Sequence, residues 1–380
     1  MAIEIKRIEP TRSNLLRFVH FPIDVLYRDN DCYVPALISD EVDTLDPTKN
    51  PAFDFCESAY FMAFRDGKPV GRIAAIINNV VNERQGKKEG RFGYIDFIDD
   101  DEVVDGLIGA AEDWLREKGM ECITGPLGFT DMDPEGMLIE GFDQLGTQAT
   151  IYNHDYYPRH MQRLGFEKDV DWVEFKITVP DEVPEKMVRI SQIVEKKYGV
   201  HNIKFTNRRK LVSEYGDAIF ALINEAYDSL FGYSPLSERQ IKHYIKMYLP
   251  FLPLDDLSLI VKDDGALVGV GIAIPSLSKA LIKSRGRLFP MGWYHLLKAF
   301  KGKNDIVDLL LVAIKPEYQN KGVNSLLFTD LIPCFQRLGY NYAESNIELE
   351  SNESVQKQWQ YFDLEQHKRR RAFTRPIKSK

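Results

Sequence analysis

The sequence lacks several features that define common classes of protein. It has only four cysteines among 380 residues, Cys32, Cys56, Cys122 and Cys334, and no two of them form a C-x-x-C pair. This spacing argues against a zinc site and fits reduced thiols in a cytoplasmic protein. No apolar run approaches the roughly 20 residues that a membrane-spanning helix needs. Residues 1–10 alternate charged and apolar side chains, which predicts that they are not a signal peptide.

A basic excess and a convincing metal motif are also missing. The net charge of −8 argues against a general nucleic-acid binder, so no nucleic-acid partner is expected. Asp131 to Gly136 opens like a calcium loop, with the pattern D-x-D-x-x-G. The bidentate glutamate that such a loop needs at its twelfth position is replaced by Phe142, and Pro134 interrupts the loop. We therefore expect a turn-rich loop and no metal.

What the sequence does contain is an internal repeat. The motif D-G-x-x-V-G occurs at Asp66–Gly71 and again at Asp264–Gly269, each time between two β-rich runs that predict a hairpin. Each hairpin is followed by a predicted strand, a helix, a glycine and another strand. This order predicts two related α/β domains, residues 1–180 and 181–380, divided at the acidic, proline-containing stretch 178–185.

Other elements follow from local signals. Residues 12–26 read as a helix with Thr11 as its N-cap, and residues 40–55, which are polar and interrupted by proline, read as a loop. Ser237 and Gln240 have the spacing of a capping box in front of a helix that extends to about Leu249.

The stretch Leu309–Leu327 organises the second half. An apolar run from Leu309 to Ile314 predicts a buried strand, which Pro316 ends because proline has no N–H to donate. A polar turn with one glycine follows, and a helix is expected from about Ser325. Backbone N–H groups in such a turn and the positive end of the helix dipole make a site for an anion, and Lys321 adds a full positive charge.

This stretch resembles the acyl-CoA loop of the GNAT superfamily of acyltransferases, which has the pattern [QR]-x-x-G-x-[GA] after a strand that reads V-x-P. Ile314-Lys315-Pro316 corresponds to V-x-P, and Gln319 and Gly322 match the first two fixed positions. Asn324 departs from the third, where the family prefers glycine or alanine. Each half resembles one GNAT domain, a mixed and mostly antiparallel sheet flanked by helices. Segments of the first half also resemble a bacterial family of tandem GNAT-like proteins without an assigned substrate.

The resemblance implies where an acyl-CoA cosubstrate would bind. The residues that it assigns to donor binding are Ile314, Gln319, Asn320, Lys321, Gly322, Val323, Asn324, Ser325 and Asn352. The first half has Asp99-Asp100-Asp101-Glu102 at the corresponding helix start, where acids would repel a pyrophosphate. We therefore expect a degenerate first domain without a CoA loop, used for structure, for shaping the substrate site or for contacts in a homodimer.

Catalytic candidates lie on the strand predicted at Tyr342–Leu349 and its continuation. Period-two alternation would place Glu344, Asn346, Glu348, Glu350 and Asn352 on one face. Glu344 and Glu350 are the preferred candidates for the base that deprotonates an incoming ammonium. In GNAT domains a tyrosine about seven residues after the asparagine protonates the departing thiolate. That position holds Trp359 here, so either Tyr361 acts as the acid or water does and the aromatic residues are core.

A basic insertion distinguishes the second half. Residues 265–304 contain no acidic residue, and seven basic residues alternate there with apolar and aromatic ones: Lys279, Lys283, Arg285, Arg287, Lys298, Lys301 and Lys303. A short amphipathic helix is expected over Trp293–Lys301. Residues 281–303 fit a peripheral contact with an anionic membrane or a channel for an acyl chain, and an ordinary packed helix is the alternative.

Together these features predict an N-acyltransferase that moves an acyl group from acetyl-CoA or a longer acyl-CoA to an amine, without a covalent enzyme intermediate. Two alternatives remain open at this stage. One is a non-catalytic acyl-CoA-binding or scaffold protein, suggested by Asn324 and Trp359. The other is an acyltransferase for an amphiphilic, lipid-like amine at the inner face of the membrane. The acceptor itself is not specified by the sequence.

Overall fold

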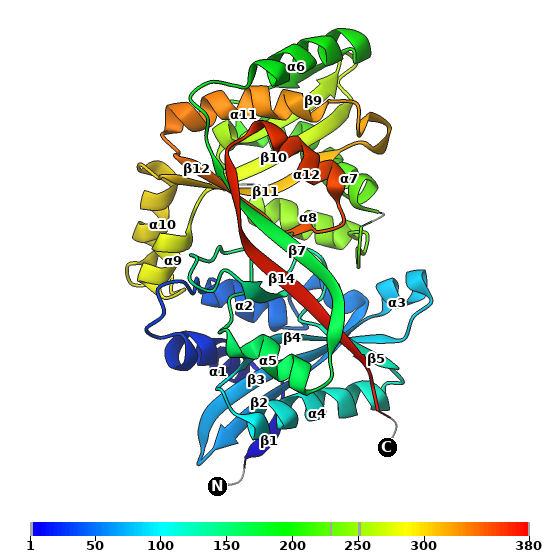
Figure 1. Cartoon of the computed structure of the whole chain (residues 1–380), viewed down its shortest axis with the longest axis vertical. Helices are drawn as coiled ribbons and strands as arrows, with labels where there is room; N and C mark the ends of the chain where they lie inside the picture. Colours follow the sequence, from blue (N-terminus) through cyan, green and yellow to red (C-terminus); the bar gives the residue numbers. More distant parts are fainter. Residues whose placement is uncertain (1–2, 229, 250–251, 379–380) are drawn as a thin grey trace. The chain divides into compact units, whose positions relative to one another are not determined.

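The computed structural model describes residues 3–228, 230–249 and 252–378 (Figure 1). By its internal contacts the chain forms two compact units that are interleaved in the sequence. Unit 1 contains the chain up to Val173, residues Leu277–Leu296 and the chain from His367 onward, and unit 2 contains Glu174–Ser276 and Leu297–Gln366. The predicted division at residue 180 differs from these units, because two later segments belong to unit 1.

Unit 1 is built on a sheet in the order β1-β2-β3-β4-β5-β14. Strands β4 and β5 pair in parallel, whereas β1–β2, β2–β3, β3–β4 and β5–β14 pair in antiparallel. Its elements are β1 (Glu4–Ile8), α1 (Arg12–Phe21), the π-helical turn η1 (Pro22–Leu26), α2 (Ile38–Leu45), η2 (Pro51–Asp54), β2 (Cys56–Arg65), β3 (Lys68–Asn78), α3 (Asn79–Gln85), β4 (Glu89–Phe97), α4 (Asp101–Glu117), β5 (Cys122–Gly125), β6 (Met137–Glu140), α5 (Tyr156–Arg163), the first part of β7 (Glu167–Thr178), α9 (Ser278–Ser284) and most of β14 (Leu364–Pro376).

Helices cover both faces of this sheet. One apolar cluster combines α4 and α5 with β2, β3 and β4, and α4 runs alongside the sheet in Figure 1. A second cluster combines α1 and α2 with the other face of β2 and β3. The predicted helix after Thr11 is confirmed, with the Thr11 hydroxyl accepting a hydrogen bond from the N–H of Asn14, although the helix becomes a π-helical turn at Pro22.

The prediction of a loop over residues 40–55 was wrong. This stretch contains α2 and the short helix η2. Ile38, Val42 and Leu45 are buried on one face of α2, at the spacing i, i+4, i+7 of an amphipathic helix. The charged and polar residues between them, which suggested a loop, form its outer face.

Unit 2 repeats the plan of unit 1. Its sheet has the order β7-β12-β11-β10-β9-β8, with β11 and β12 in parallel and the hairpin β9–β10 in antiparallel. Its elements are α6 (Glu185–Tyr198), β8 (Val200–Ile203), α7 (Arg208–Tyr227), α8 (Glu238–Tyr248), η3 (Leu254–Asp256), β9 (Leu257–Lys262), β10 (Leu267–Pro275), β11 (Ile306–Ile314), η4 (Pro316–Tyr318), α11 (Asn324–Leu338), β12 (Tyr342–Ser345), β13 (Glu348–Leu349), α12 (Glu353–Gln356) and η5 (Lys357–Tyr361).

The repeated motif marks equivalent hairpin turns in the two units. Gly67 and Gly265 both have positive φ angles, of 75° and 85°, so each turn uses the conformation that glycine adopts without strain. The order of hairpin, strand, helix and strand predicted after each turn is confirmed. The Ser237 capping box is also confirmed, because the hydroxyl of Ser237 accepts from the N–H of Gln240 while the Gln240 side chain accepts from the N–H of Ser237.

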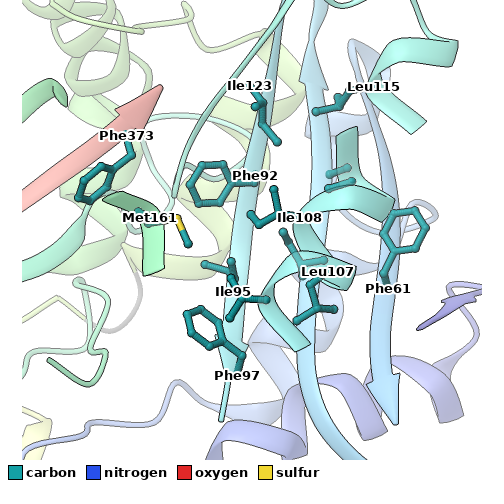
Figure 2. Packing of buried hydrophobic residues seen from close by; sticks show 14 of the residues in the cluster. Phe61, Phe92, Ile95, Phe97, Leu107, Ile108, Leu115, Ile123, Met161 and Phe373 are labelled. Atoms are coloured by element: carbon teal, nitrogen blue, oxygen red, sulfur yellow. The ribbon is translucent and has the colours of Figure 1, made fainter. Parts of the chain in front are cut away.

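Each sheet is completed by a strand from the other half of the sequence. Unit 2 uses the end of β7, where Thr178 lies opposite Tyr342 of β12. Unit 1 uses β14 near the C-terminus, where Phe373 lies opposite Gly125 of β5. Phe373 is buried in the apolar cluster of unit 1, and Figure 2 shows it beside Met161 and Phe92. Unit 1 therefore depends on residues that are more than 200 positions away from most of its sequence.

Replacing Phe373 with alanine is expected to lower the free energy of unfolding by about 3–5 kcal/mol, because it leaves a cavity in a closed core. Gln366→Ala, at an exposed position of the same strand, serves as the control and should change little. Chemical denaturation of the full chain measures both. Equal unfolding midpoints for the two variants would show that β14 is not part of the core of unit 1.

The basic insertion forms two helices, α9 and α10 (Gly292–Lys301), so the short helix predicted at its end is confirmed. The two arginines of the insertion form ion pairs within unit 1. The guanidinium groups of Arg285 and Arg287 lie 3.1 Å from the carboxylate of Asp24, after α1. Within the described residues, no helix is long and apolar enough to span a membrane.

Candidate acyl-donor site

Strand β11 has an open edge in its second half. Among the described residues, it pairs with β12 from Ile306 to Leu309, and beyond Leu309 its strand partner is β10, antiparallel on the other side. A register shift between Ile272 and Ala273 bulges β11 at Leu310, where the two parallel strands part. The side chain of Val312 is exposed there, although it lies in the middle of a central strand.

Side chains from neighbouring elements, not another strand, reach this edge. The Asn346 amide donates to the carbonyl of Leu310 at 3.0 Å, and the Tyr227 hydroxyl donates to the carbonyl of Val312 at 3.0 Å. Because the N–H and C=O of a regular strand residue point to the same side, the N–H groups of Val312 and Ile314, which lie beyond the bulge, face this edge as well. The edge can therefore offer backbone donors to an extended molecule lying beside it.

The open edge leads directly into the loop between β11 and α11. The Gln319 side chain donates to the carbonyl of Ile314 at 2.9 Å, which ties the loop back to the strand. Asn320 and Gly322 have positive φ angles, of 57° and 80°. A Cβ atom at Gly322 would lie 2.8 Å from a methyl group of Ile190, so this position needs glycine both for its conformation and for space.

The loop has the backbone donors expected of an anion site. In the described part of the chain, the N–H groups of residues 320–324 donate to no backbone or side-chain acceptor. The N–H of Ser325 and its hydroxyl both donate to the carbonyl of Gly322, which closes the turn at the start of α11. The ammonium group of Lys321 lies 5.7 Å from the ring centre of Tyr198. Several N–H groups and a lysine thus surround a helix N-terminus, a combination suited to a phosphate.

Asn324, the position that departs from the family pattern, is the first residue of α11, one residue earlier than predicted. Its side-chain amide donates to the side-chain oxygen of Gln358 on η5 at 3.3 Å. Val323 and Ser325 on either side of it are buried. The side chain of Asn324 thus has a specific partner in this protein, which accounts for a residue larger than glycine or alanine at this position.

The predicted continuous strand from Tyr342 onward is interrupted, so the period-two prediction was wrong beyond Ser345. Strand β12 ends at Ser345, and the short strand β13 begins at Glu348. At the break the Asn346 side chain accepts from the N–H of Ile347, while its amide holds Leu310 of β11. The side chains before and after this break therefore belong to two separate strands, β12 and β13, both of which pair with β7.

The two preferred base candidates therefore lie in different surroundings. Glu344 is buried in the paired part of the sheet, with Asp308 of β11 and Lys176 of β7 at the neighbouring register positions. Glu350 lies beyond β13 in a turn and is exposed. The structure does not bring these two carboxylates together, and each remains a separate prediction.

A third carboxylate, Glu348, has the environment expected of a base. The indole N–H of Trp359 donates to its two carboxylate oxygens, at 2.9 and 3.1 Å. Burial raises the pKa of Glu348 to about 7, and the hydrogen bond from Trp359 opposes this rise. The sequence placed Glu348 in the alternating set but did not favour it, because its partner Trp359 is brought beside it only by folding.

The aromatic residues after Asn352 are divided between two roles. Trp359 is buried and packs with Phe328 and Phe362 at ring-centre distances of 5.7 and 6.0 Å, so the core interpretation is confirmed for Trp359. Tyr361 ends η5 and is half-buried, with the ammonium of Lys186 4.7 Å from its ring centre. Asn352 caps α12 by accepting from the N–H of Val355. The acid role of Tyr361 and the donor-binding role of Asn352 remain predictions.

Unit 1 uses the corresponding helix start differently. Asp100 caps α4 by accepting from the N–H of Val103, and its carboxylate lies 2.7 Å from the guanidinium of Arg65. Asp99 binds Arg159 and His160 on α5. The prediction that acidic residues cap this helix is confirmed, and in the order of elements this helix start of unit 1 corresponds to the one that the donor loop precedes in unit 2.

The turn-rich loop predicted over residues 131–136 is confirmed. The carboxylate of Asp133 accepts from the N–H of Thr130, and burial raises the pKa of Asp133 to about 6. No cluster of three or more potential metal ligands occurs among the described residues, and the four cysteines are free thiols.

Comparison with solved structures identifies the architecture. The tandem GNAT protein from the clavulanic acid biosynthesis pathway matches with a TM-score of 0.58 and 11% identity, over 100% of both chains. A GCN5-related N-acetyltransferase from Sphaerobacter thermophilus matches with a TM-score of 0.52 and 11% identity, over 99% of this chain and 96% of its own. The chain has the tandem GNAT fold, an α/β architecture of two sheets flanked by helices.

Two curated sequences are similar over nearly the full length. Protein YghO of Escherichia coli K12 is 28% identical over 372 residues, covering 96% of this chain and 94% of that protein. The bacterial ceramide synthase of Caulobacter vibrioides is 28% identical over 356 residues, covering 91% and 90%. No protein-family model matches the chain.

Proposed function

We propose that this protein is an acyl-CoA-dependent N-acyltransferase whose donor site lies in unit 2. The observation that carries the proposal is the continuous path from the open edge of β11 into the loop at residues 319–324, where consecutive N–H groups are unbonded within the described structure. An elongated thioester with a phosphate group at one end matches this path. The tandem GNAT fold, which the chain shares with acetyltransferases, supports the same assignment.

The chain's own groups suit direct transfer. Bound acyl-CoA supplies an acyl group activated as a thioester, with its phosphates at the N–H groups and Lys321 of the loop. An N–H of β11 near Ile314 polarises the thioester carbonyl. The Glu348 carboxylate accepts the proton of the incoming ammonium, so that the amine nitrogen forms a bond to the carbonyl carbon while the bond to sulfur breaks. The thiolate takes a proton from Tyr361 or from water, and the second proton, which the nitrogen loses after its attack, replaces that one.

The acceptor that we propose is an amphiphilic amine. Six exposed large apolar side chains lie within residues 288–297, an unusual concentration for a protein that acts on small polar molecules. The name of the Caulobacter relative, a ceramide synthase, points in the same direction. The rival function is acyl-CoA binding without transfer, which the tryptophan at the position of the usual tyrosine favours.

A thiol-release assay separates these functions. The protein is incubated with acetyl-CoA or a long-chain acyl-CoA, with and without a small polar amine or a long-chain amine. The proposal predicts release of free CoA only when an amine is present, and faster release with the long-chain amine. Tight acyl-CoA binding with no amine-dependent release would establish the binding function instead.

The pH dependence of transfer should report the state of Glu348. Because burial raises its pKa to about 7, the ionised form that can accept a proton is populated only above that pH, so the rate should rise through about pH 7. Trp359→Phe removes the N–H that stabilises the carboxylate of Glu348. The rise in rate should therefore shift to higher pH, by about one pH unit.

The matched control for this shift is Trp114→Phe, a replacement of another buried tryptophan, on α4 of unit 1. This control should leave the pH at which the rate rises unchanged. If that pH is also unchanged in Trp359→Phe, the rise reports the ionisation of the substrate amine or of another carboxylate.

A further inference from the structure

Exposed apolar side chains are concentrated in one short segment. Six of the ten exposed large apolar side chains of the described residues lie between Leu288 and Leu297, which we call the apolar segment: Leu288, Phe289, Met291, Trp293, Tyr294 and Leu297. Phe289 is 72% exposed and Trp293 is 47% exposed. Scattered exposed apolar residues are ordinary, but a contiguous group marks a contact surface.

The residues just before the apolar segment are held in place by contacts within unit 1. Arg285 and Arg287, just before it, form ion pairs with Asp24, and the carbonyl of Gly286 accepts from the N–H of Ile38 at 3.0 Å. These contacts bind the base of the segment to unit 1. The two arginines therefore position the segment through their ion pairs with Asp24.

The chain within the segment is also tightly folded. A Cβ atom at Gly292 would lie 1.7 Å from the carbonyl oxygen of Arg287, so the turn closes as far as glycine permits. The N–H of Trp293 donates to the carbonyl of Leu288 at 2.9 Å, and its indole N–H donates to the carbonyl of Pro290 at 3.0 Å. These two hydrogen bonds fix the turn and keep the indole ring of Trp293 at the surface.

The sequence on both sides of the apolar segment carries basic residues and no acidic ones. No acidic residue occurs from Gly265 to Asn304, whereas the whole chain has a net charge of −8. Lys298 and Lys301 follow Tyr294 and Leu297 by four residues on α10, so the lysines continue the face on which those apolar side chains lie. Lys283, Lys298 and Lys301 are all exposed.

We propose that the apolar segment docks this protein on the surface of an anionic lipid bilayer, with Phe289 and Trp293 entering the headgroup region and the lysines of α10 contacting anionic headgroups. A tryptophan and a phenylalanine flanked by lysine suit this interface, where an aromatic ring lies between apolar chains and polar headgroups. Two copies that met through this same lysine-rich segment would bring like charges together, so the charge pattern favours an anionic bilayer over a symmetric dimer. The inference deepens the proposed function by placing its amphiphilic acceptor at the membrane, but docking itself does not require transfer.

Co-sedimentation of the full chain with lipid vesicles tests the docking. Binding is expected with vesicles of phosphatidylcholine and phosphatidylglycerol, and should be much weaker with phosphatidylcholine alone or at high salt. Phe289→Ser with Trp293→Ser should weaken binding by about tenfold or more. Lys298→Glu with Lys301→Glu should weaken it by at least about fivefold for each lysine. Ile193→Ser, at another exposed apolar residue, on α6, is the matched control and should bind like the unchanged protein.

Tryptophan fluorescence provides a second, local measurement. The chain has four tryptophans, and Trp293 is exposed whereas Trp114, Trp172 and Trp359 are buried. Addition of anionic vesicles should shift the emission to shorter wavelength, and brominated lipids should quench it. Trp293→Phe should abolish both effects.

Two results would overturn the docking proposal. One is equal vesicle binding by the Phe289→Ser, Trp293→Ser variant and the Ile193→Ser control. The other is the absence of vesicle binding together with a dimer that the same double substitution dissociates, which would make the apolar segment a contact between copies. Calorimetric titration with CoA in the absence of lipid tests the proposed function separately. The Phe289→Ser, Trp293→Ser variant should bind CoA as the unchanged protein does. If the unchanged protein does not bind CoA, the proposed donor site is wrong, but the docking proposal is unaffected.

Discussion

Gly322→Asp is expected to abolish CoA binding. The residue has a φ angle of 80°, and a Cβ atom would lie 2.8 Å from a methyl group of Ile190, so any side chain strains the loop by about 1–3 kcal/mol. The aspartate carboxylate would in addition introduce a negative charge among the N–H groups proposed to hold the phosphates. Both effects act at the same place, so calorimetry should show at least a hundredfold loss of affinity.

Gly265→Asp is the control that distinguishes loop strain and charge at residue 322 from a general loss of stability. This residue also has a positive φ angle, of 85°, but it lies in the hairpin turn of unit 2, where a Cβ atom meets only a distant hydroxyl of Tyr215. The substitution adds the same charge and a similar backbone cost away from the loop. We expect normal CoA affinity for this control. Undiminished binding in Gly322→Asp, or two equal sites per chain, would contradict a single donor site at this loop.

Glu348→Gln is expected to lower the rate of acyl transfer by about 10²–10⁴-fold while CoA affinity is retained. Glutamine keeps the size of the side chain and can still accept the indole N–H of Trp359, but it cannot accept a proton from the amine. The expected loss is therefore in the transfer step. Transfer rates at saturating acyl-CoA, together with calorimetry, distinguish this from a loss of binding.

The same substitution at the two sequence-predicted positions identifies the base. Glu344→Gln changes a buried carboxylate within the paired part of the sheet, and Glu350→Gln changes an exposed one in the turn after β13. If either variant shows the large loss while Glu348→Gln remains active, the base is that residue and our assignment of Glu348 is wrong. If all three remain active, the binding-protein interpretation is favoured.

Features set by local sequence could be predicted. The Asp66-Gly67 and Asp264-Gly265 turns require residues that adopt positive φ angles, and the helix caps at Thr11 and Ser237 depend on contacts within three or four positions. The loop at Gly322 belongs to the same class, because a strand, a proline, a glycine turn and a helix start are consecutive in the chain. This is why the tandem GNAT architecture and the location of the candidate donor site followed from the sequence.

Features that depend on distant contacts could not be predicted. Polar and apolar residues alternate after Tyr342 and through Asn346, and no local residue signals the end of a strand. The break at Asn346 involves a contact with a distant residue, because the Asn346 amide donates to the carbonyl of Leu310 on β11. The raised pKa of Glu348 depends on its burial in the folded chain, and the hydrogen bond that opposes this rise comes from Trp359, eleven residues later. The completion of the sheet of unit 1 by β14 involves pairing between Phe373 and Gly125, which no local pattern encodes.

Mass spectrometry of the products tests the central claim most directly. The unchanged protein is incubated with a long-chain acyl-CoA and a long-chain amine. The masses of the small molecules and of the intact protein are then measured. Our account predicts an amide that carries the acyl group, one free CoA for each amide, and a protein mass without an added acyl group; Gly322→Asp should yield no amide. An acylated protein, or acyl-CoA recovered intact beside unreacted amine, would contradict direct transfer in unit 2.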